Sequence, residues 1–285
     1  KFVGDIISYL MEQDGEEEKF QNLFLAGKCL FEVRSRQSIN DVGSRLLNRL
    51  KDLTGWYDLG YFYEPYGEDA KSVREIRTQA VEIVATSWRD DPSTYTWLKQ
   101  RVESDDSEYV RGEAVREIAT AWKHEPGILD LLKQRVESDK SSYVRSEVLR
   151  KIATGWKHEP GILDLLKQRV ESDDDMFVRS EAVRQIATGW KHEPGILDLL
   201  KQWVEFDDDS DVRREAVRQI ATGWKHKPGI LDLLKQRVES DESSDVRREA
   251  LRQIATAWKH EPGILDLLKP VSYTHLTLPT SNDVL

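Results

Sequence analysis

The sequence predicts an all-α protein: an α-solenoid (superhelix) of two-helix repeats with a 34-residue period, preceded by a short helical region. Three observations predict this fold. First, one tryptophan recurs every 34 residues, which is typical of a repeat protein. Second, apolar residues within each repeat recur with helical periodicity. Third, a proline at a fixed position divides each repeat into two helices. The tryptophans are Trp88, Trp122, Trp156, Trp190, Trp224 and Trp258.

The composition is that of a charged, mildly acidic protein with enough apolar residues for a core. The chain has 285 residues, of which 39% are hydrophobic and 33% charged, and its formal net charge is -10. That charge disfavours nucleic acid and anionic lipid as partners. No apolar run reaches the roughly 20 residues that span a bilayer, and the single cysteine, Cys29, fits a reducing compartment. We therefore expect a cytoplasmic protein and, because it starts at Lys1 without methionine, a fragment.

Residues 1–68 are expected to form a helical N-terminal region that ends in an aromatic linker. The linker runs from Trp56 to Tyr66 and is rich in Tyr, Trp and Phe. The favoured interpretation is a cap over the exposed end of the first repeat, because solenoids need capped ends. The alternative is a binding role, since Trp and Tyr are strong anchors at interfaces.

Each repeat is expected to contain two amphipathic helices, as residues 110–138 illustrate. Residues 110–122 place their apolar side chains on one helical stripe. After the short link from Lys123 to Glu125, Pro126 suits the first position of the second helix, where its missing N–H does no harm. Residues 127–138 carry a second apolar stripe, and the short link makes the two helices antiparallel. The segment 139–142 supplies carboxylate and hydroxyl groups that cap the next helix.

A hairpin of 34 residues cannot bury both apolar stripes alone, so neighbouring repeats must stack in a one-dimensional array. The array is expected to span residues 69–269 and to contain six repeats, the last one truncated. Packed helices lie about 8 to 10 Å apart. One layer of helices therefore lines a continuous face that suits a large partner.

The residues of the repeat also carry a family resemblance. The pattern Asp-x-x-x-x-Val-Arg-x-x-Ala-Val-x-x-Ile-Ala runs from Asp207 to Ala221 and recurs in the other repeats. It resembles the short bacterial HEAT repeat, also called HEAT-like or lyase-type, from about Asp69 to Lys269. The tetratricopeptide repeat shares the period but not this pattern. The resemblance implies a scaffold of armadillo-type fold that binds another protein, with no cofactor and no catalytic residue.

The segment before the repeats resembles a second family. Residues 22–36, followed by residues 46–53 and the aromatic linker, are similar to the helical region between NTPase module and HEAT array in bacterial NACHT-type signalling NTPases. In that family the array is a sensor or partner-binding arm, whereas hydrolysis and oligomerisation belong to the preceding module. No G-x-x-x-x-G-K-[ST] phosphate loop occurs in this chain. We therefore expect a recognition arm that is not itself an enzyme and that forms homo-oligomers only through regions outside this chain.

The repeat pattern stops at Pro270, where the other repeats have glutamine. Residues 271–280 resemble the conceptual translation of a transposon-derived sequencing adaptor. We therefore interpret residues 270–285 as a non-native tail, with a genuine disordered terminus as the alternative, and we assign them no function.

One set of arginines is expected to lie within the apolar stripe, where a cation needs a partner. The acidic turns before and after each arginine offer carboxylates, so a structural staple between repeats is favoured over ligand binding. The arginines are Arg111, Arg145, Arg179, Arg213 and Arg247, and the acidic residues are Asp105, Asp139, Asp173, Asp207 and Asp241.

A second set of arginines points away from the stripe and forms the candidate partner-binding surface. The favoured interpretation pairs each arginine with the glutamate three residues earlier, as Arg116 with Glu113, in a solvated salt bridge. The functional alternative is that an arginine every 8 to 10 Å or so, beside threonines, meets an acidic protein surface or a phosphate chain. The net charge favours the protein. The arginines are Arg116, Arg150, Arg184, Arg218 and Arg252, and the threonines are Thr120, Thr154, Thr188 and Thr222.

A histidine also recurs, but metal binding is not expected. The histidines are His124, His158, His192, His226 and His260. One histidine every 8 to 10 Å or so cannot share a zinc ion whose ligand bonds are about 2 Å long. No nucleophile–base constellation stands out either. A rival function of another class remains open, because the repeat is also similar to HEAT-like proteins of the bilin lyase type, which act on phycobiliproteins.

Overall fold

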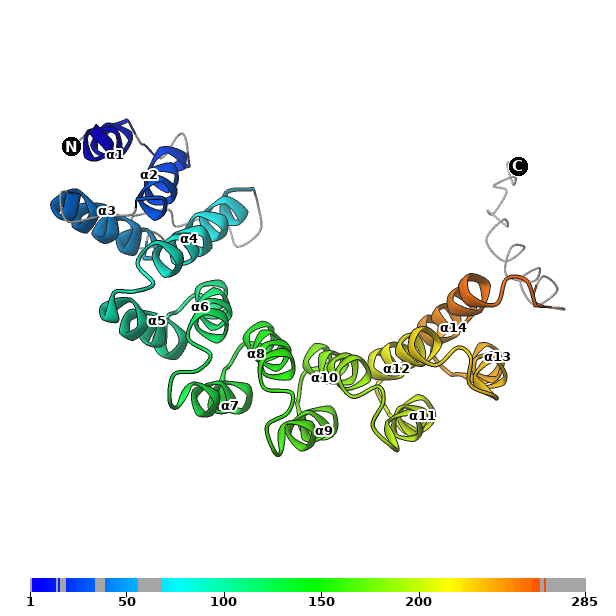
Figure 1. Ribbon diagram of the computed structural model, residues 1–285. Helices are drawn as coiled ribbons and strands as arrows, with labels where there is room; N and C mark the ends of the chain where they lie inside the picture. Colours follow the sequence, from blue (N-terminus) through cyan, green and yellow to red (C-terminus); the bar gives the residue numbers. More distant parts are fainter. Residues whose placement is uncertain are drawn as a thin grey trace, which may run out of the picture. The chain divides into compact units, whose positions relative to one another are not determined.

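The computed structural model describes residues 2–13, 15, 19–33, 39–55, 68–261 and 264. The described residues form fourteen helices and no strand, so the predicted all-α solenoid of two-helix repeats is confirmed. The chain divides into two compact units, Lys1–Trp156 and Lys157–Leu285, and Figure 1 shows their helices in chain order. The aromatic linker interpreted as a cap and the tail interpreted as non-native lie outside the described residues.

The helices of the two units have the following bounds. The first unit contains α1 (Phe2–Glu12), α2 (Gln21–Phe31), α3 (Asn40–Leu53), α4 (Glu68–Ser87), α5 (Pro92–Ser104), α6 (Glu108–Ala121), α7 (Ile128–Ser138) and α8 (Ser142–Gly155). The second unit contains α9 (Ile162–Ser172), α10 (Met176–Gly189), α11 (Ile196–Phe206), α12 (Ser210–Gly223), α13 (Ile230–Ser240) and α14 (Ser244–Ala257).

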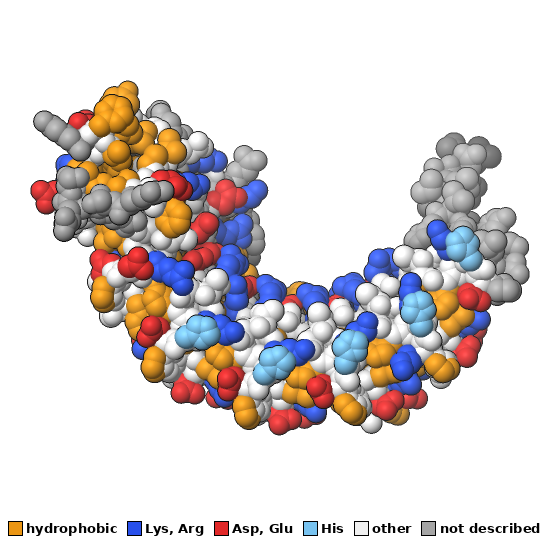
Figure 2. Space-filling model, in the orientation of Figure 1, with side chains coloured by type: hydrophobic (Ala, Val, Ile, Leu, Met, Phe, Trp, Pro, Cys, Tyr) orange, Lys and Arg blue, Asp and Glu red, His pale blue; other side chains and the backbone are white. Residues whose placement is uncertain are grey.

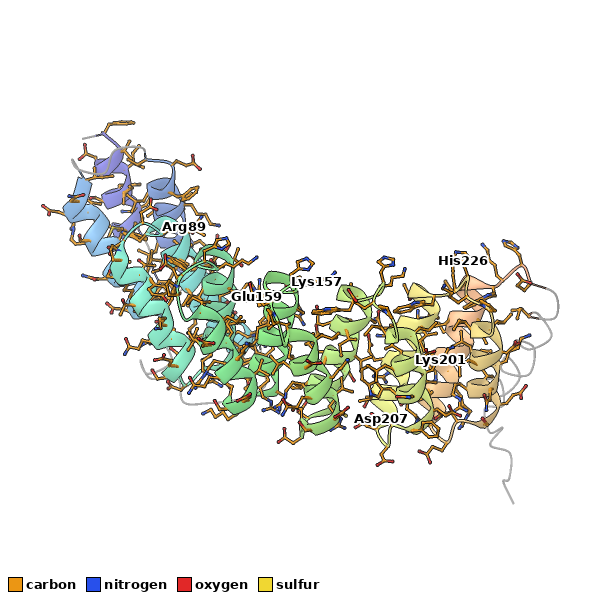
Figure 3. All side chains as sticks on the ribbon, turned by 60° about the horizontal axis from the view of Figure 1, so that its bottom comes forward. Arg89, Lys157, Glu159, Lys201, Asp207 and His226 are labelled. Carbon is orange, nitrogen blue, oxygen red and sulfur yellow. The ribbon has the colours of Figure 1, made fainter. Side chains whose placement is uncertain are left out.

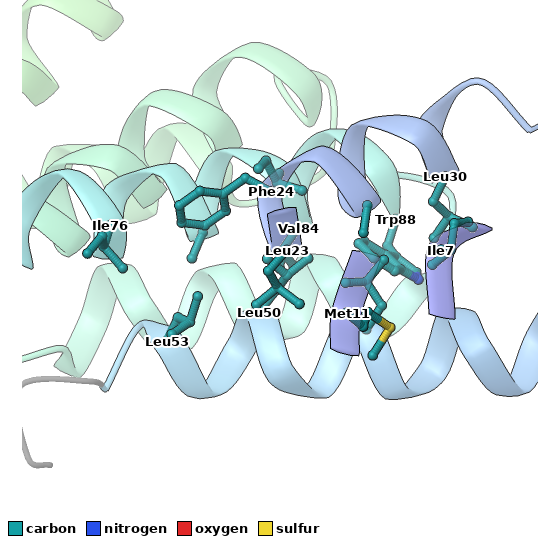
Figure 4. Close-up of a cluster of buried hydrophobic side chains, with 14 of the residues drawn as sticks. Ile7, Met11, Leu23, Phe24, Leu30, Leu50, Leu53, Ile76, Val84 and Trp88 are labelled. Carbon is teal, nitrogen blue, oxygen red and sulfur yellow. The ribbon is translucent and has the colours of Figure 1, made fainter. Parts of the chain in front are cut away.

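Helices α1 to α4 share one hydrophobic core at the start of the first unit (Figure 4). Ile7 of α1, Leu23 of α2 and Leu50 of α3 are fully or almost fully buried there, together with Ile83 of α4. Gly27 lets α2 approach α4 closely, because a Cβ at this position would collide with the Ile83 side chain. Helix α4 therefore completes the N-terminal core and also begins the repeats. The predicted boundaries at residues 68 and 269 stay a prediction.

The first helices of successive repeats pack side by side: α4, α6 and α8 in the first unit, and α10, α12 and α14 in the second. Within each unit, a second helix packs more extensively against the first helix of the next repeat than against that of its own, as α7 does against α8. The closest hairpin is therefore not the one expected across Lys123 to Glu125. The acidic turn between α7 and α8 has only residues 139–141, whereas residues 122–127 separate α6 from α7.

The expectation that Pro126 starts a helix is wrong, because the residue after it is glycine. Gly127 has a left-handed φ of 81°, and α7 begins only at Ile128. In the first repeat the equivalent Pro92 does begin α5. The Asp91 side chain caps that helix by accepting a hydrogen bond from the backbone N–H of Ser93. A left-handed φ suits glycine. The Pro-Gly pair thus delays the helix start in the later repeats.

Two glycines of the second unit are expected to respond oppositely to alanine. Gly189 ends α10, and a Cβ there meets nothing within 4 Å; Gly189→Ala should therefore raise the free energy of unfolding by about 0.5 to 1 kcal/mol. Gly195 has a φ of 84°, so Gly195→Ala should lower it by about 1 kcal/mol. Urea unfolding of both variants measures the difference. Shifts of the same sign would contradict this account.

Candidate functional site

Buried arginines link successive repeats, and Arg111 on α6 shows the geometry. Its Nε and Nη2 donate to Oδ2 and Oδ1 of Asp139 at 2.9 and 2.8 Å. Its Nη1 donates to the backbone oxygen of Asp105 at 2.8 Å. The Arg111 and Asp139 side chains are only 4% and 2% exposed. This bidentate pair joins α6 to the turn before α8 and so holds one repeat on the next.

The second unit contains the same arrangement. Arg213 on α12 donates to both carboxylate oxygens of Asp241, at 3.3 and 3.1 Å, and to the backbone oxygen of Asp207 at 2.7 Å. The backbone bond also recurs where Arg145 donates to the Asp139 oxygen at 2.9 Å and Arg247 to the Asp241 oxygen at 2.6 Å. The structure therefore places Arg111 and Arg213 between successive repeats and buries both, and it ties Arg145 and Arg247 to the turns that precede their own helices.

One arginine departs from the pairing expected from the sequence, and one further arginine makes the pairing without having been predicted. Arg179 donates to the backbone oxygen of Asp173 at 2.8 Å, but its Nη2 bonds the carboxylate of Asp209 at 2.6 Å instead of that of Asp207. Arg77 is an additional member that the sequence analysis missed, and its Nη2 lies 3.1 Å from Oδ1 of Asp105. Its position 34 residues before Arg111 was the signal that identifies it.

The second set of arginines lies at the surface above buried glutamates. In the first unit, Nη1 of Arg116 donates to Glu113 at 2.6 Å, and its Nε donates to Glu147 of the next repeat at 3.5 Å. The Arg116 side chain is 41% exposed, whereas those of Glu113 and Glu147 are 10% and 3% exposed. Arg150 similarly bonds Glu147 at 2.6 Å. The guanidinium groups therefore face solvent while the carboxylates lie beneath them.

In the second unit these arginines form what we call the arginine row: Arg184, Arg218 and Arg252 on α10, α12 and α14. Arg184 bonds Glu181 of its own helix at 2.8 Å and Glu215 of the next first helix at 2.9 Å. Arg218 bonds Glu215 of its own helix at 2.9 Å and Glu249 of the next first helix at 3.1 Å. Glu181 and Glu215 are only 6% and 5% exposed, against 42% and 36% for Arg184 and Arg218. Each carboxylate thus fixes a guanidinium in place.

Each candidate threonine is exposed one helical turn after its arginine. The Thr188 hydroxyl donates to the Arg184 backbone oxygen at 2.7 Å, and the Thr222 hydroxyl donates to that of Arg218 at 2.8 Å. Thr120 and Thr154 make the same bond in the first unit. These threonines add an uncharged strip beside the arginines and take no part in the glutamate pairs.

Lysines follow the same helices and lie over the tryptophan of the next repeat. The Nζ atom of Lys157 is 5.9 Å from the ring centre of Trp190, and that of Lys191 is 5.9 Å from the ring centre of Trp224. In the first unit, Lys123 lies 5.8 Å from the ring centre of Trp156. A cation over an indole face is attracted to it. The ring therefore helps to hold each ammonium group beside the helix end.

The two edges of the second unit differ in charge. Helices α10 and α12 begin after the acidic turns 173–175 and 207–209 and end before Lys-His pairs. Figure 3 shows Lys157, Glu159 and His226 along one edge of this unit, which carries charges of both signs, and Asp207 along the opposite edge. The histidines are exposed, and Figure 2 shows them beside Lys and Arg side chains. Acidic groups at helix N-termini and basic groups at C-termini complement the helix dipoles.

Glu249 shows how strongly the arginine row stabilises a carboxylate. Burial disfavours the charged form of Glu249, but hydrogen bonds from Arg252, Gln253 and Arg218 outweigh it and lower its pKa to about 2. Glu249 therefore remains ionised beneath the row across the whole range of pH in which the protein is expected to be folded.

Glu117 in the first unit has the opposite shift. Burial, together with the charges of Glu113 and Glu82, raises the pKa of Glu117 to about 7, although Lys151 and Arg116 oppose the shift. The equivalent residues of the second unit are glutamines, and Gln185 and Gln219 donate to the glutamate four residues earlier at 2.8 Å. Glu117 can donate the equivalent bond only when it is protonated.

Glu117→Gln is therefore expected to remove a pH-dependent loss of stability. The pKa is about 7 in the folded chain and ordinarily 4.5, so the folded state binds the extra proton and stability falls as pH rises through that window. Above pH 7 the variant should be more stable than the parent by about 1 kcal/mol, and the difference should vanish toward pH 4.5. Urea unfolding across that range measures it. The reverse change Gln185→Glu serves as the control, and a pH-independent difference would contradict the assignment.

No metal or membrane feature occurs in the part of the chain that the structure describes. There, no group of three His, Cys, Asp or Glu side chains is arranged to hold a metal ion. None of the described helices combines the length and the apolar character needed to cross a membrane.

Comparison with known protein families identifies the repeats. Two overlapping segments, residues 95–187 and 129–221, match the model for HEAT repeats. The segments begin within the second helices α5 and α7. The family model therefore starts its repeat at a second helix, which is also the helix that packs most closely against the next first helix. A search among curated proteins found no match. The central part of the chain thus consists of HEAT repeats, and the protein is an α-solenoid that contains an array of them.

Proposed function

We propose that this protein is a protein-recognition scaffold whose binding surface lies on the first helices of its repeats. HEAT repeats and other solenoids bind partners over extended surfaces. The observation that carries the proposal is the pairing of exposed guanidinium groups with buried glutamates, as in Arg184 above Glu181. Because the glutamates already fix the arginines, little side-chain entropy is lost when a partner binds.

Site-specific photo-crosslinking tests this surface. A photoreactive phenylalanine at Thr188 or Thr222 should capture a protein partner in extracts of the cells from which the gene comes. The same group at Gln202 or Gln236, on the second helices α11 and α13, is the control. These two glutamines are exposed, as the two threonines are, so a difference in capture does not come from burial. Capture that is equal at both pairs, stronger at the outer pair, or absent from both would contradict the proposal.

We further propose that the array is the sensor arm of a larger bacterial NACHT-type signalling NTPase in the cytoplasm. The support is the resemblance of residues 22–36 and 46–53, part of which forms α2 and α3, to the region before the HEAT array in that family. The coding sequence upstream of Lys1 tests the proposal. A phosphate-loop motif encoded there is the expected result, and a start codon directly before Lys1 would contradict it.

A further inference from the structure

We infer that the arginine row binds an extended acidic segment of a partner protein, with a carboxylate at every third residue. This inference rests on the proposed function and names the chemistry of the partner. It concerns only the second unit and its three first helices α10, α12 and α14.

The first step is the supply of free hydrogen-bond donors. Arg184 and Arg218 use Nε and Nη1 on the glutamates beneath them. Their Nη2 groups donate to no protein acceptor among the described residues. A partner carboxylate that approaches from solvent therefore meets a fixed guanidinium with a remaining donor, and such charge-assisted bonds are strong.

The second step is a line of lysines just past the C-terminal ends of the same helices. Lys191, Lys225 and Lys259 each follow an arginine of the row by seven residues and lie two residues beyond the ends of α10, α12 and α14. The exposed threonines lie between the two lines of cations. Each of the three repeats thus offers two cations and an uncharged strip, although the buried glutamate beneath each arginine balances its charge and the chain as a whole carries a net charge of -10.

The first unit lacks this uniform charge. Glu82 stands on α4 where later repeats have the surface arginine, and Glu117 stands on α6 where the second unit has glutamine. Both carboxyl groups lie close enough to interact, since the charge of Glu82 helps to raise the pKa of Glu117. An acidic segment would be repelled there, which favours the second unit as its site.

The third step is spacing, which selects the conformation of the partner. Packed helices lie about 8 to 10 Å apart, so the arginine row should have this repeat. A polyproline II segment rises about 3.1 Å per residue with three residues per turn, so every third side chain lies on one side at about 9 Å intervals. Glutamates at every third residue therefore match successive arginines. Phosphates of a nucleic acid strand lie about 3.4 Å apart along its axis, nearly three times as densely, and do not match this spacing.

Fluorescence anisotropy with the full chain tests the inference. The probe is a labelled peptide of six Glu-Pro-Ala triplets, compared with a peptide of the same composition whose glutamates are in one block. A single-stranded DNA of equal charge is the third probe. The triplet peptide should bind about ten-fold more tightly than the block peptide, since both charge and register are matched.

Matched variants locate the binding surface. Thr188→Glu with Thr222→Glu places two carboxylates beside the arginine row and should weaken triplet binding about ten-fold. Gln202→Glu with Gln236→Glu adds the same charge on the second helices α11 and α13. It should leave the affinity for the triplet peptide within about two-fold of that of the parent chain. Thermal unfolding of both double variants checks that they fold.

The outcomes separate this inference from the proposed function. Equal binding of triplet and block peptides, equal weakening by both double variants, or tighter binding of the DNA would overturn the inference. If the peptides do not bind but Thr188 still crosslinks to a protein, the acidic segment is the wrong partner and the scaffold function stands. If neither occurs, both fail.

Discussion

Arg111→Ala is expected to lower the free energy of unfolding by about 3 to 5 kcal/mol. The change would leave the Asp139 carboxylate, which is 2% exposed, without the guanidinium that binds both of its oxygens. A buried unpaired charge costs far more than a surface pair contributes, because the desolvation penalty remains uncompensated. Urea unfolding followed by far-UV circular dichroism measures the loss.

Two comparisons make the Arg111 experiment decisive. Arg248→Ala removes one partner of a surface pair with Asp245, in which the two side chains are 71% and 53% exposed, and should cost no more than about 1 kcal/mol. The double change Arg111→Met with Asp139→Leu removes both charges and should recover most of the stability lost in Arg111→Ala. A loss as small as that of Arg248→Ala would show that the Arg111–Asp139 pair does not hold the repeats together.

Ile220→Ala is expected to cost about 2 to 5 kcal/mol and to weaken the cooperativity of unfolding. Ile220 is fully buried on α12, which packs between α10 and α14. A cavity there loosens contacts on both sides, and in a one-dimensional array the helices on either side can then unfold separately. Calorimetry should show a broader or divided transition, because two-state behaviour fails when repeats uncouple.

The matched control for Ile220 is Thr222→Ala on the same helix. Thr222 is exposed and bonds only the backbone oxygen one turn earlier, so its removal should change stability by less than about 0.5 kcal/mol. A single sharp transition for Ile220→Ala, shifted no further than that of Thr222→Ala, would contradict nearest-neighbour coupling through α12.

The sequence predicted the helices well because each repeat places its apolar residues at helical spacing. It did not predict how the repeats pair. A strict period can be divided at any phase, so the tryptophan spacing does not say which neighbouring helices pack most closely. Pro126 misled for a local reason, since the effect of a proline on a helix start depends on whether the next residue is Gly127 or, as in the first repeat, Ser93.

Less of the candidate surface was predictable. Helical geometry places Arg116 outside the apolar stripe, but it does not say that its glutamate partners are buried while the guanidinium is exposed. The choice of Asp209 by Arg179 was hidden for another reason, because the turn 207–209 offers three aspartates in a row. The sequence also did not predict that α4 packs both in the N-terminal core and against the repeats, since an apolar residue such as Ile83 suits either environment.

The reach of the Arg–Asp staple has a consequence for how this gene can change. The staples Arg111–Asp139 and Arg213–Asp241 connect residues 28 positions apart, and Arg179–Asp209 connects residues 30 apart, all of which is less than one 34-residue block. Unequal recombination that deletes or duplicates a whole block therefore rebuilds the staple at the junction and strands no buried charge. Residues 127–138, 161–172 and 229–240 are identical, so an exchange between these segments leaves the second helix unchanged. Length polymorphism in whole blocks should thus be the most readily tolerated variation of this locus.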